Sequence, residues 1–301
     1  MSLNLGRTRP GRVLTLLPWV LWAGAGHAAA AQLPSLPPVE LVRRAVHNEL
    51  QAGESSPYLF RSRKQTPNGS QTRLYAQTRE AVAGMTIAWN DKPLTPEQRQ
   101  AEVARLQRFI ADPEELRKKQ RQEKENSDRV NRILKALPDA FLYEYDGTEP
   151  GRPGVGRAGR EVVRLKFRPN PQYDPPSRVE QVLPGMQGLM LIDAKHERLA
   201  LIDGTLFKDV GFGWGLLGHL DRGGRVVLEQ APVGNGDWRI TRTRLHLTGK
   251  VLLFKNIKVD FTEVFTDFQR VADDLTFAQG MDLLKKQERL LAETLKQQGN
   301  P

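Results

Sequence analysis

The clearest pattern in the chain is the alternation of apolar and polar residues with period two. Val163, Leu165 and Phe167 alternate with basic residues, which is typical of a strand with one buried face. Similar segments recur from Tyr58 to Phe268 and predict eight or nine strands in antiparallel order. Strands and helices do not alternate as they do in a parallel sheet. The pattern therefore predicts an α+β fold with one strongly curved antiparallel sheet and helices on one face.

A charged helical segment interrupts these strands at residues 95–137. Thr95 and Gln98 have the spacing of a capping box, and a second cap followed by proline starts at Asp112. We expect a helical hairpin inserted between strands, ended by Pro138.

Two further helices are predicted near the ends of the chain. Residues 39–51 carry apolar side chains along one stripe and are followed by glycine and proline. Residues 279–297 place leucines on one side. The domain we predict comprises residues 32–301, with the insertion and the C-terminal helix as parts of it.

The first 31 residues have the pattern of a secretory signal peptide. Three arginines and no acidic residue precede an apolar run at residues 13–25, and alanines at 28–31 suit cleavage before Gln32. An uncleaved anchor is the alternative, although Pro18 and His27 interrupt the apolar stretch. We expect the mature chain to be exported, periplasmic and soluble.

Composition narrows the possible functions. The chain has no cysteine, which excludes thiol nucleophiles, disulfides, iron–sulfur clusters and cysteine-linked lipid. Its net charge of +10 falls to +7 when the three arginines of the leader are removed. Some strand residues are alternately basic and aromatic, such as Arg73 and Tyr75, a pattern that is typical of nucleic-acid-binding surfaces. Because export removes the protein from nucleic acid, we interpret them as a solvated face, with anionic lipid headgroups as the alternative.

Catalytic and metal-binding patterns are not evident. The four histidines beyond the leader are too far apart for a helical zinc pair, and no serine lies in a nucleophile elbow. Neighbouring acids such as Asp273 and Asp274 do not face each other on a helix or a strand. We predict no metal, no cofactor and no catalytic residue, while a hydrolase with a scattered triad stays an alternative.

A glycine-rich segment at residues 211–218 carries bulky apolar side chains and no lysine, serine or threonine. A phosphate-binding loop needs such polar groups, so an apolar flap or cavity lip is the better interpretation. Together with two aromatic residues of the predicted strands, this segment supplies the candidate cavity residues. These are Phe60, Trp89, Phe212, Trp214, Leu216 and Leu217.

Three strand segments carry a family resemblance. A strand at residues 163–170 ends in Pro-Asn, and an apolar strand at 188–193 ends in Asp and precedes its hairpin partner at 199–204. This pattern resembles the exported lipoprotein-carrier-like superfamily, which includes the periplasmic carrier LolA, related lipoprotein-sorting proteins and sensor domains of anti-sigma regulators. The resemblance implies an antiparallel half-barrel whose concave face is covered by helices around an apolar cavity. The insertion at 95–137 departs from the compact carrier.

These observations favour a non-enzymatic periplasmic protein that binds a lipid, an acyl chain or a lipoprotein in an apolar cavity. The alternative is an envelope sensor or interaction module whose helical hairpin docks a protein partner. We expect no nucleic-acid partner.

Overall fold

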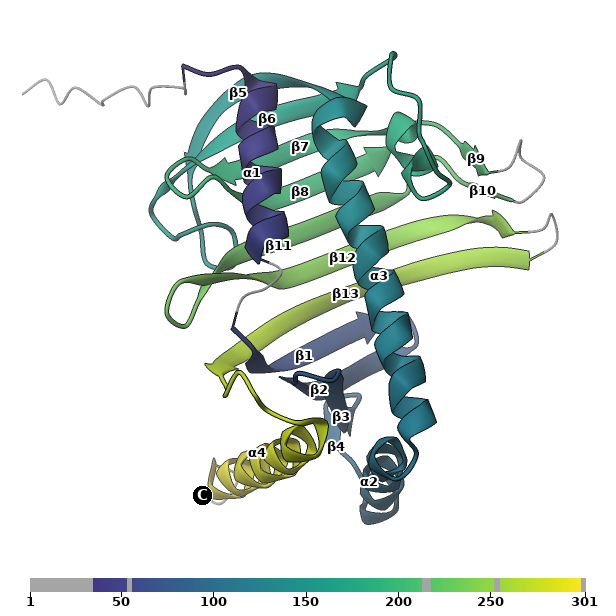
Figure 1. The fold of residues 1–301 in the computed structure, drawn as a ribbon, viewed down its shortest axis with the longest axis vertical. Helices are drawn as coiled ribbons and strands as arrows, with labels where there is room; N and C mark the ends of the chain where they lie inside the picture. The colour runs from purple at the N-terminus through teal and green to yellow at the C-terminus, as the bar shows by residue number, and fades with distance from the viewer. Residues whose placement is uncertain (1–34, 53–55, 213–217, 252–254, 299–301) are drawn as a thin grey trace, which may run out of the picture. The chain divides into compact units, whose positions relative to one another are not determined.

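The computed structural model describes residues 35–52, 56–212, 218–251 and 255–298, so the predicted leader lies outside the described residues. The strands form one antiparallel sheet in the order β4-β3-β2-β1-β13-β12-β11-β8-β7-β6-β5, and the β9–β10 hairpin joins β12 (Figure 1). Strands β4 and β5 lie at the two ends of this order and do not pair with each other, so the sheet is not closed. Helices pack against this sheet, and the predicted α+β class is confirmed. The strands are β1 (Tyr58–Thr66), β2 (Gly69–Gln77), β3 (Val82–Trp89), β4 (Lys92–Pro93), β5 (Phe141–Pro150), β6 (Glu161–Pro169), β7 (Met186–Asp193), β8 (Arg198–Leu206), β9 (Val210–Phe212), β10 (Gly218–Leu220), β11 (Arg225–Val233), β12 (Asp237–Val251) and β13 (Lys255–Arg270).

The two helices of the insertion begin at caps that are visible in the sequence. The Thr95 side chain accepts from the backbone N–H of Gln98 in a complete capping box, and Asp112 caps the next helix. Pro138 lies inside that helix, two residues before its end, so the expected stop at Pro138 was two residues too early. The helices are α1 (Pro38–Ala52), α2 (Pro96–Ala111), α3 (Pro113–Ala140), the short 3₁₀ helix η1 (Glu180–Gly185) and α4 (Phe277–Gln298).

One face of the sheet, here called the α3 face, carries α1 and the C-terminal end of α3. Apolar residues of α1, including Leu41 and Val42, pack with Leu137 of α3 against Val163 and Leu165 of β6. All five side chains are at most 4% exposed, so this half of the sheet has a sealed core.

The opposite face, here called the α4 face, carries α4 at the other end of the sheet. Phe277 and Met281 of α4 pack with Leu59 of β1 and Leu74 of β2. Phe60, the neighbour of Leu59, points to the α3 face because side chains alternate along a strand. The sequence predicts helices on one face, but the apolar residues of β1 and β2 occupy both faces, and α4 packs on the second.

Candidate functional site

A band of half-buried apolar side chains lies in the middle of the α3 face. The register across the strands is continuous, since Val226 of β11 lies opposite Leu245 of β12, which lies opposite Phe261 of β13. None of its members belongs to the three described core clusters. This hydrophobic strip consists of Phe60, Val226, Leu228, Leu245, Leu247, Val259, Phe261 and Phe265.

Aromatic rings gather at the β1 end of the hydrophobic strip. The ring of Phe60 stacks on Tyr75 with 5.2 Å between centroids and on Phe268 with 5.5 Å. Phe265 meets Phe60 edge-on at 6.1 Å. Such pairs contribute about 0.5–1.5 kcal/mol beyond the area that they bury. The rings therefore form a firm apolar wall rather than a set of independent side chains.

Helix α3 runs across the strands of this face in Figure 1, and its firm contacts lie toward its ends. Leu116, Glu123, Val130 and Leu137 are spaced by seven residues and so lie along one stripe of the helix. Leu116 packs against the α4 cluster, and the Glu123 carboxylate accepts from the backbone N–H of Val82 at 3.1 Å. Leu137 is buried in the core under α1, whereas Val130 is 58% exposed.

The polar contacts of the middle of α3 stay within the helix. Lys124 pairs with Asp128 at 3.0 Å, and Arg129 lies 4.0 Å from Glu125. In the part of the chain that the structure describes, no side chain of residues 124–132 makes a hydrogen bond or ion pair with the sheet. Helix α3 is therefore fixed near both ends. Its middle is loosely packed and faces the hydrophobic strip.

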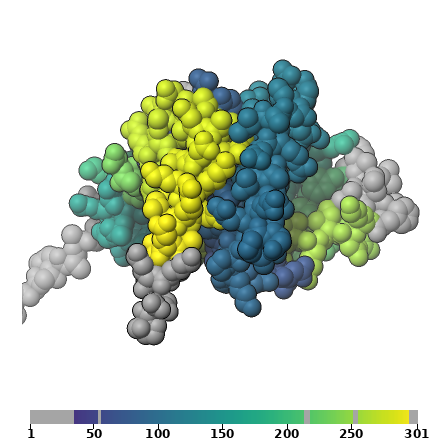
Figure 2. Space-filling model, turned by 90° about the horizontal axis from the view of Figure 1, so that it is seen from below, coloured from purple at the N-terminus to yellow at the C-terminus, as the bar shows by residue number. Residues whose placement is uncertain are grey.

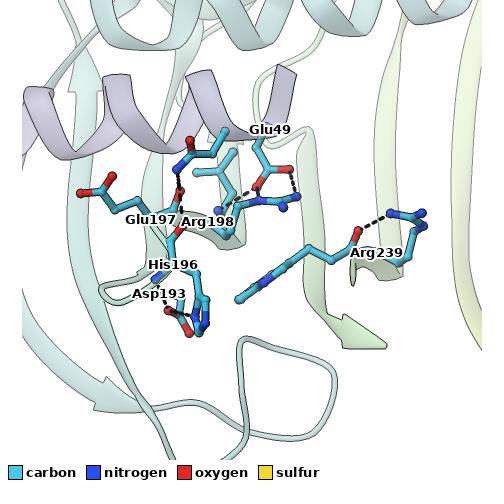
Figure 3. Close-up of polar contacts among 9 residues, drawn as sticks. Glu49, Asp193, His196, Glu197, Arg198 and Arg239 are labelled. Atoms are coloured by element: carbon cyan, nitrogen blue, oxygen red, sulfur yellow. Dashed lines mark hydrogen bonds and ion pairs between the residues drawn. The ribbon is translucent and has the colours of Figure 1, made fainter. Parts of the chain in front are cut away.

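A polar cluster fixes the end of α1 to the turn between β7 and β8 (Figure 3). The Glu49 carboxylate accepts two hydrogen bonds from Arg198, at 2.8 and 2.9 Å, and their side chains are only 8% and 13% exposed. Asp193 accepts from the backbone N–H groups of Lys195 and His196 and contacts the His196 ring at 2.8 Å. These acids are occupied by arginine and by turn hydrogen bonds, so the cluster acts as a structural anchor.

Arg239 lies next to this cluster, and among the residues that the structure describes it is the arginine whose pKa is lowered. Burial lowers the pKa of its guanidinium, which donates to the backbone oxygens of Trp238 and Ser56. The guanidinium lies over the ring of Tyr58, 4.7 Å from its centroid. These contacts hold the first residues of β1 against β12.

A groove lies on the α4 face, between α4, the N-terminal end of α2 and the β3–β4 turn. Its volume is about 680 Å³. Arg99 of α2 and Glu288 of α4 bridge it at 2.7 Å, and Figure 2 shows α4 beside the α2–α3 segment at this surface. Arg61, Asp91 and Arg289 also line this α4 groove. Most of its lining is nevertheless apolar, so the α4 groove is a second candidate site for an apolar ligand.

The six candidate cavity residues have different positions. Phe60 lies in the hydrophobic strip, and Trp89 lies on the same face at the end of β3, 47% exposed. Phe212 ends β9 and is half-buried. Trp214, Leu216 and Leu217 lie outside the described residues.

Leu245, Leu247 and Phe261 were not among the residues expected to line a cavity. Their alternation with Arg244, His246 and other polar residues was a usable signal for two half-buried strands. The missing information was which helix covers them.

No family model matches the chain, and no curated protein matches it. Among solved structures, the chain is similar to a LolA superfamily protein from Nitrosomonas europaea. The two are 8% identical, and the similarity covers 79% of this chain and 95% of that chain with a TM-score of 0.26.

Among the described residues there is no group of three or more histidines or acids that could hold a metal ion. No helix in this part of the chain is long and apolar enough to cross a membrane.

Proposed function

We propose that this protein binds the acyl chain of a lipid or lipoprotein on the hydrophobic strip, beneath the middle of α3. The observation that carries the proposal is a continuous apolar surface that belongs to no core cluster and lies under a helix held near its ends. The predicted leader supports a ligand of the cell envelope.

The size of the strip suits an extended chain. Four neighbouring strands span about 14 Å, and the six-residue step from Val259 to Phe265 covers about 20 Å along β13. Each methylene that leaves water contributes about 0.8 kcal/mol, so an acyl chain of ordinary length gains enough free energy to bind. Because α3 crosses the strip without sealing it, a ligand enters by displacing only weak contacts.

Displacement of a fluorescent apolar probe tests the proposal. We expect 1-N-phenylnaphthylamine to bind the full chain and laurate to displace it. Leu245→Asn should weaken the affinity for both ligands by about tenfold, because a polar amide would face the acyl chain. The matched control is Val264→Asn on the neighbouring strand β13, a half-buried residue that alternates with Phe265 and pairs with Arg242, so its side chain lies on the opposite face. Equal effects of the two variants would contradict the proposal.

A labelling experiment locates the ligand. Since the chain has no cysteine, each single-cysteine variant carries one reactive thiol. Laurate should slow maleimide labelling of Val226→Cys and leave the labelling of Val264→Cys, on the opposite face, unchanged. Ala292→Trp, which fills the α4 groove, should leave laurate binding intact. If Ala292→Trp abolishes binding while Leu245→Asn does not, the ligand lies in the α4 groove and the proposal is wrong.

A further inference from the structure

One end of the hydrophobic strip opens into a polar pocket where β13 runs past the β1–β2 turn. Strand β1 pairs with β13 only as far as Gln65 opposite Thr262, whereas β13 begins at Lys255. The pocket in this corner has a volume of about 480 Å³. Two strip residues, Val259 and Phe261, line it, so it is continuous with the strip. Its polar lining residues are Lys64, Thr66, Asn68, Lys258 and Asp260.

Lys64 places a positive charge at the boundary between the strip and the pocket. Its ammonium lies 3.9 Å from the ring centroid of Phe261, and the side chain is half-buried. In the described part of the chain, no carboxylate lies within 4.0 Å of this ammonium. A partly desolvated ammonium with a ring as its close partner favours an additional anionic partner.

The two acids nearest in the register have other partners. Glu263, directly across from Lys64, accepts from the hydroxyl of Ser62. Asp260 lies 3.5 Å from His246. Lys258, in the same pocket, has no ion pair among the described residues. The lining of the pocket contains two lysines and one aspartate, so the pocket has a small excess of positive charge beside an apolar surface.

We propose that the ligand is an anionic lipid whose headgroup accepts a hydrogen bond from the Lys64 ammonium while its acyl chain lies along the hydrophobic strip. This inference rests on the proposed function and adds the chemical class of the headgroup. A free anion would use only the polar lining of this corner, whereas an amphiphile also uses Phe261 and the strip beyond it. Charge complementarity and continuity with the strip both favour the lipid.

Two ligands with the same chain and different heads test the headgroup. Laurate and dodecanol are used to displace 1-N-phenylnaphthylamine from the full chain at neutral pH, where laurate is ionised. We expect laurate to bind about tenfold more tightly than dodecanol, the difference that one charge-assisted hydrogen bond supplies. Lys64→Gln should bring this ratio close to one and leave dodecanol unchanged. Lys64→Arg should preserve it, and Lys92→Gln on the exposed strand β4 is the matched control.

The outcomes separate the two proposals. If both ligands bind with equal affinity, or if the preference for laurate survives in Lys64→Gln, the headgroup inference is wrong and the apolar site stands. If neither ligand binds, the proposed function fails and the headgroup inference fails with it. If inorganic phosphate displaces laurate, the corner is a site for free anions, and the lipid assignment is overturned.

Discussion

Two regions of the α3 face have the same alternation of apolar and polar residues but differ in how deeply their apolar side chains are buried. Under α1, Leu165 of β6 and Ile192 of β7 are fully buried. In the hydrophobic strip, Leu245 and Phe261 alternate in the same way and stay half-buried. The side chains that both regions present on this face are apolar, so the difference lies in the helix above them.

The covering helices explain this difference. Helix α1 presents Leu41, Val42, Ala45 and Val46 to the sheet, and the end of α3 adds Leu137. The middle of α3 is a run of charged and amide side chains in which Val130 is exposed. An apolar strand face becomes a sealed core where a helix matches it with an apolar stripe, and otherwise stays available to another apolar partner.

The largest expected effect comes from releasing the covered region. Glu49→Ala leaves Arg198 buried without its carboxylate, and we expect a loss of about 3–5 kcal/mol in the free energy of unfolding. Urea denaturation measures this loss. The double variant Glu49→Ala/Arg198→Met should recover part of it, since no unpaired charge remains. A loss below about 1 kcal/mol in the single variant would show that α1 does not depend on this anchor.

A matched pair of truncations compares the two regions directly. Leu165→Ala removes a side chain that is 0% exposed and should cost about 2–5 kcal/mol. Leu245→Ala removes a half-buried leucine of the hydrophobic strip, and we expect less than about 1.5 kcal/mol. Both values come from urea unfolding without ligand. If the two losses are equal, the strip is part of the core and the comparison fails.

Much of the fold was predictable because local signals act over short distances. The capping box at Thr95, the cap at Asp112 and the alternation of β6 are visible in the sequence and are found in the structure. The face to which α4 packs was not predictable. Leu59 and Phe60 are both apolar neighbours, so periodicity in β1 does not decide which side receives a helix.

The candidate site was predictable only in part, for a similar reason. Phe60 was chosen as an aromatic strand residue and lies in the hydrophobic strip. Leu245 and Phe261 reach the same strip through pairing between β12 and β13, a register that no single segment encodes. The role of Lys64 depends on Phe261, almost 200 residues away, and on the end of β1–β13 pairing.

A smaller effect is expected at acid pH, where α2 is fastened to the edge of β3. Burial alone would raise the pKa of the Glu102 carboxyl, but hydrogen bonds from Arg105 and from the backbone N–H of Thr86 lower it below its ordinary value of 4.5. A lowered pKa means that this group stabilises the fold above pH 4.5 and that the contribution disappears as the pH falls through the folded-state pKa.

We therefore expect the wild-type chain to lose more stability than Glu102→Gln between about pH 5 and about pH 3. Thermal unfolding at a series of pH values measures the difference between the two chains. Other carboxylates titrate in both, so they cancel in the comparison. Parallel curves would show that Glu102 does not hold α2 to the sheet.

The smallest effect is expected at Val130, and there the sign decides. If the middle of α3 stands away from the hydrophobic strip, Val130→Ala removes no packing and replaces a β-branched residue by the best helix former. We then expect the free energy of unfolding to rise by up to about 0.6 kcal/mol. Leu137→Ala, one stripe position further along α3, should lower it, because that side chain is only 4% exposed. A loss of more than about 1 kcal/mol for Val130→Ala would mean that α3 already seals the strip. A ligand would then have to displace a packed helix, and the acyl chain would have no ready place beneath it.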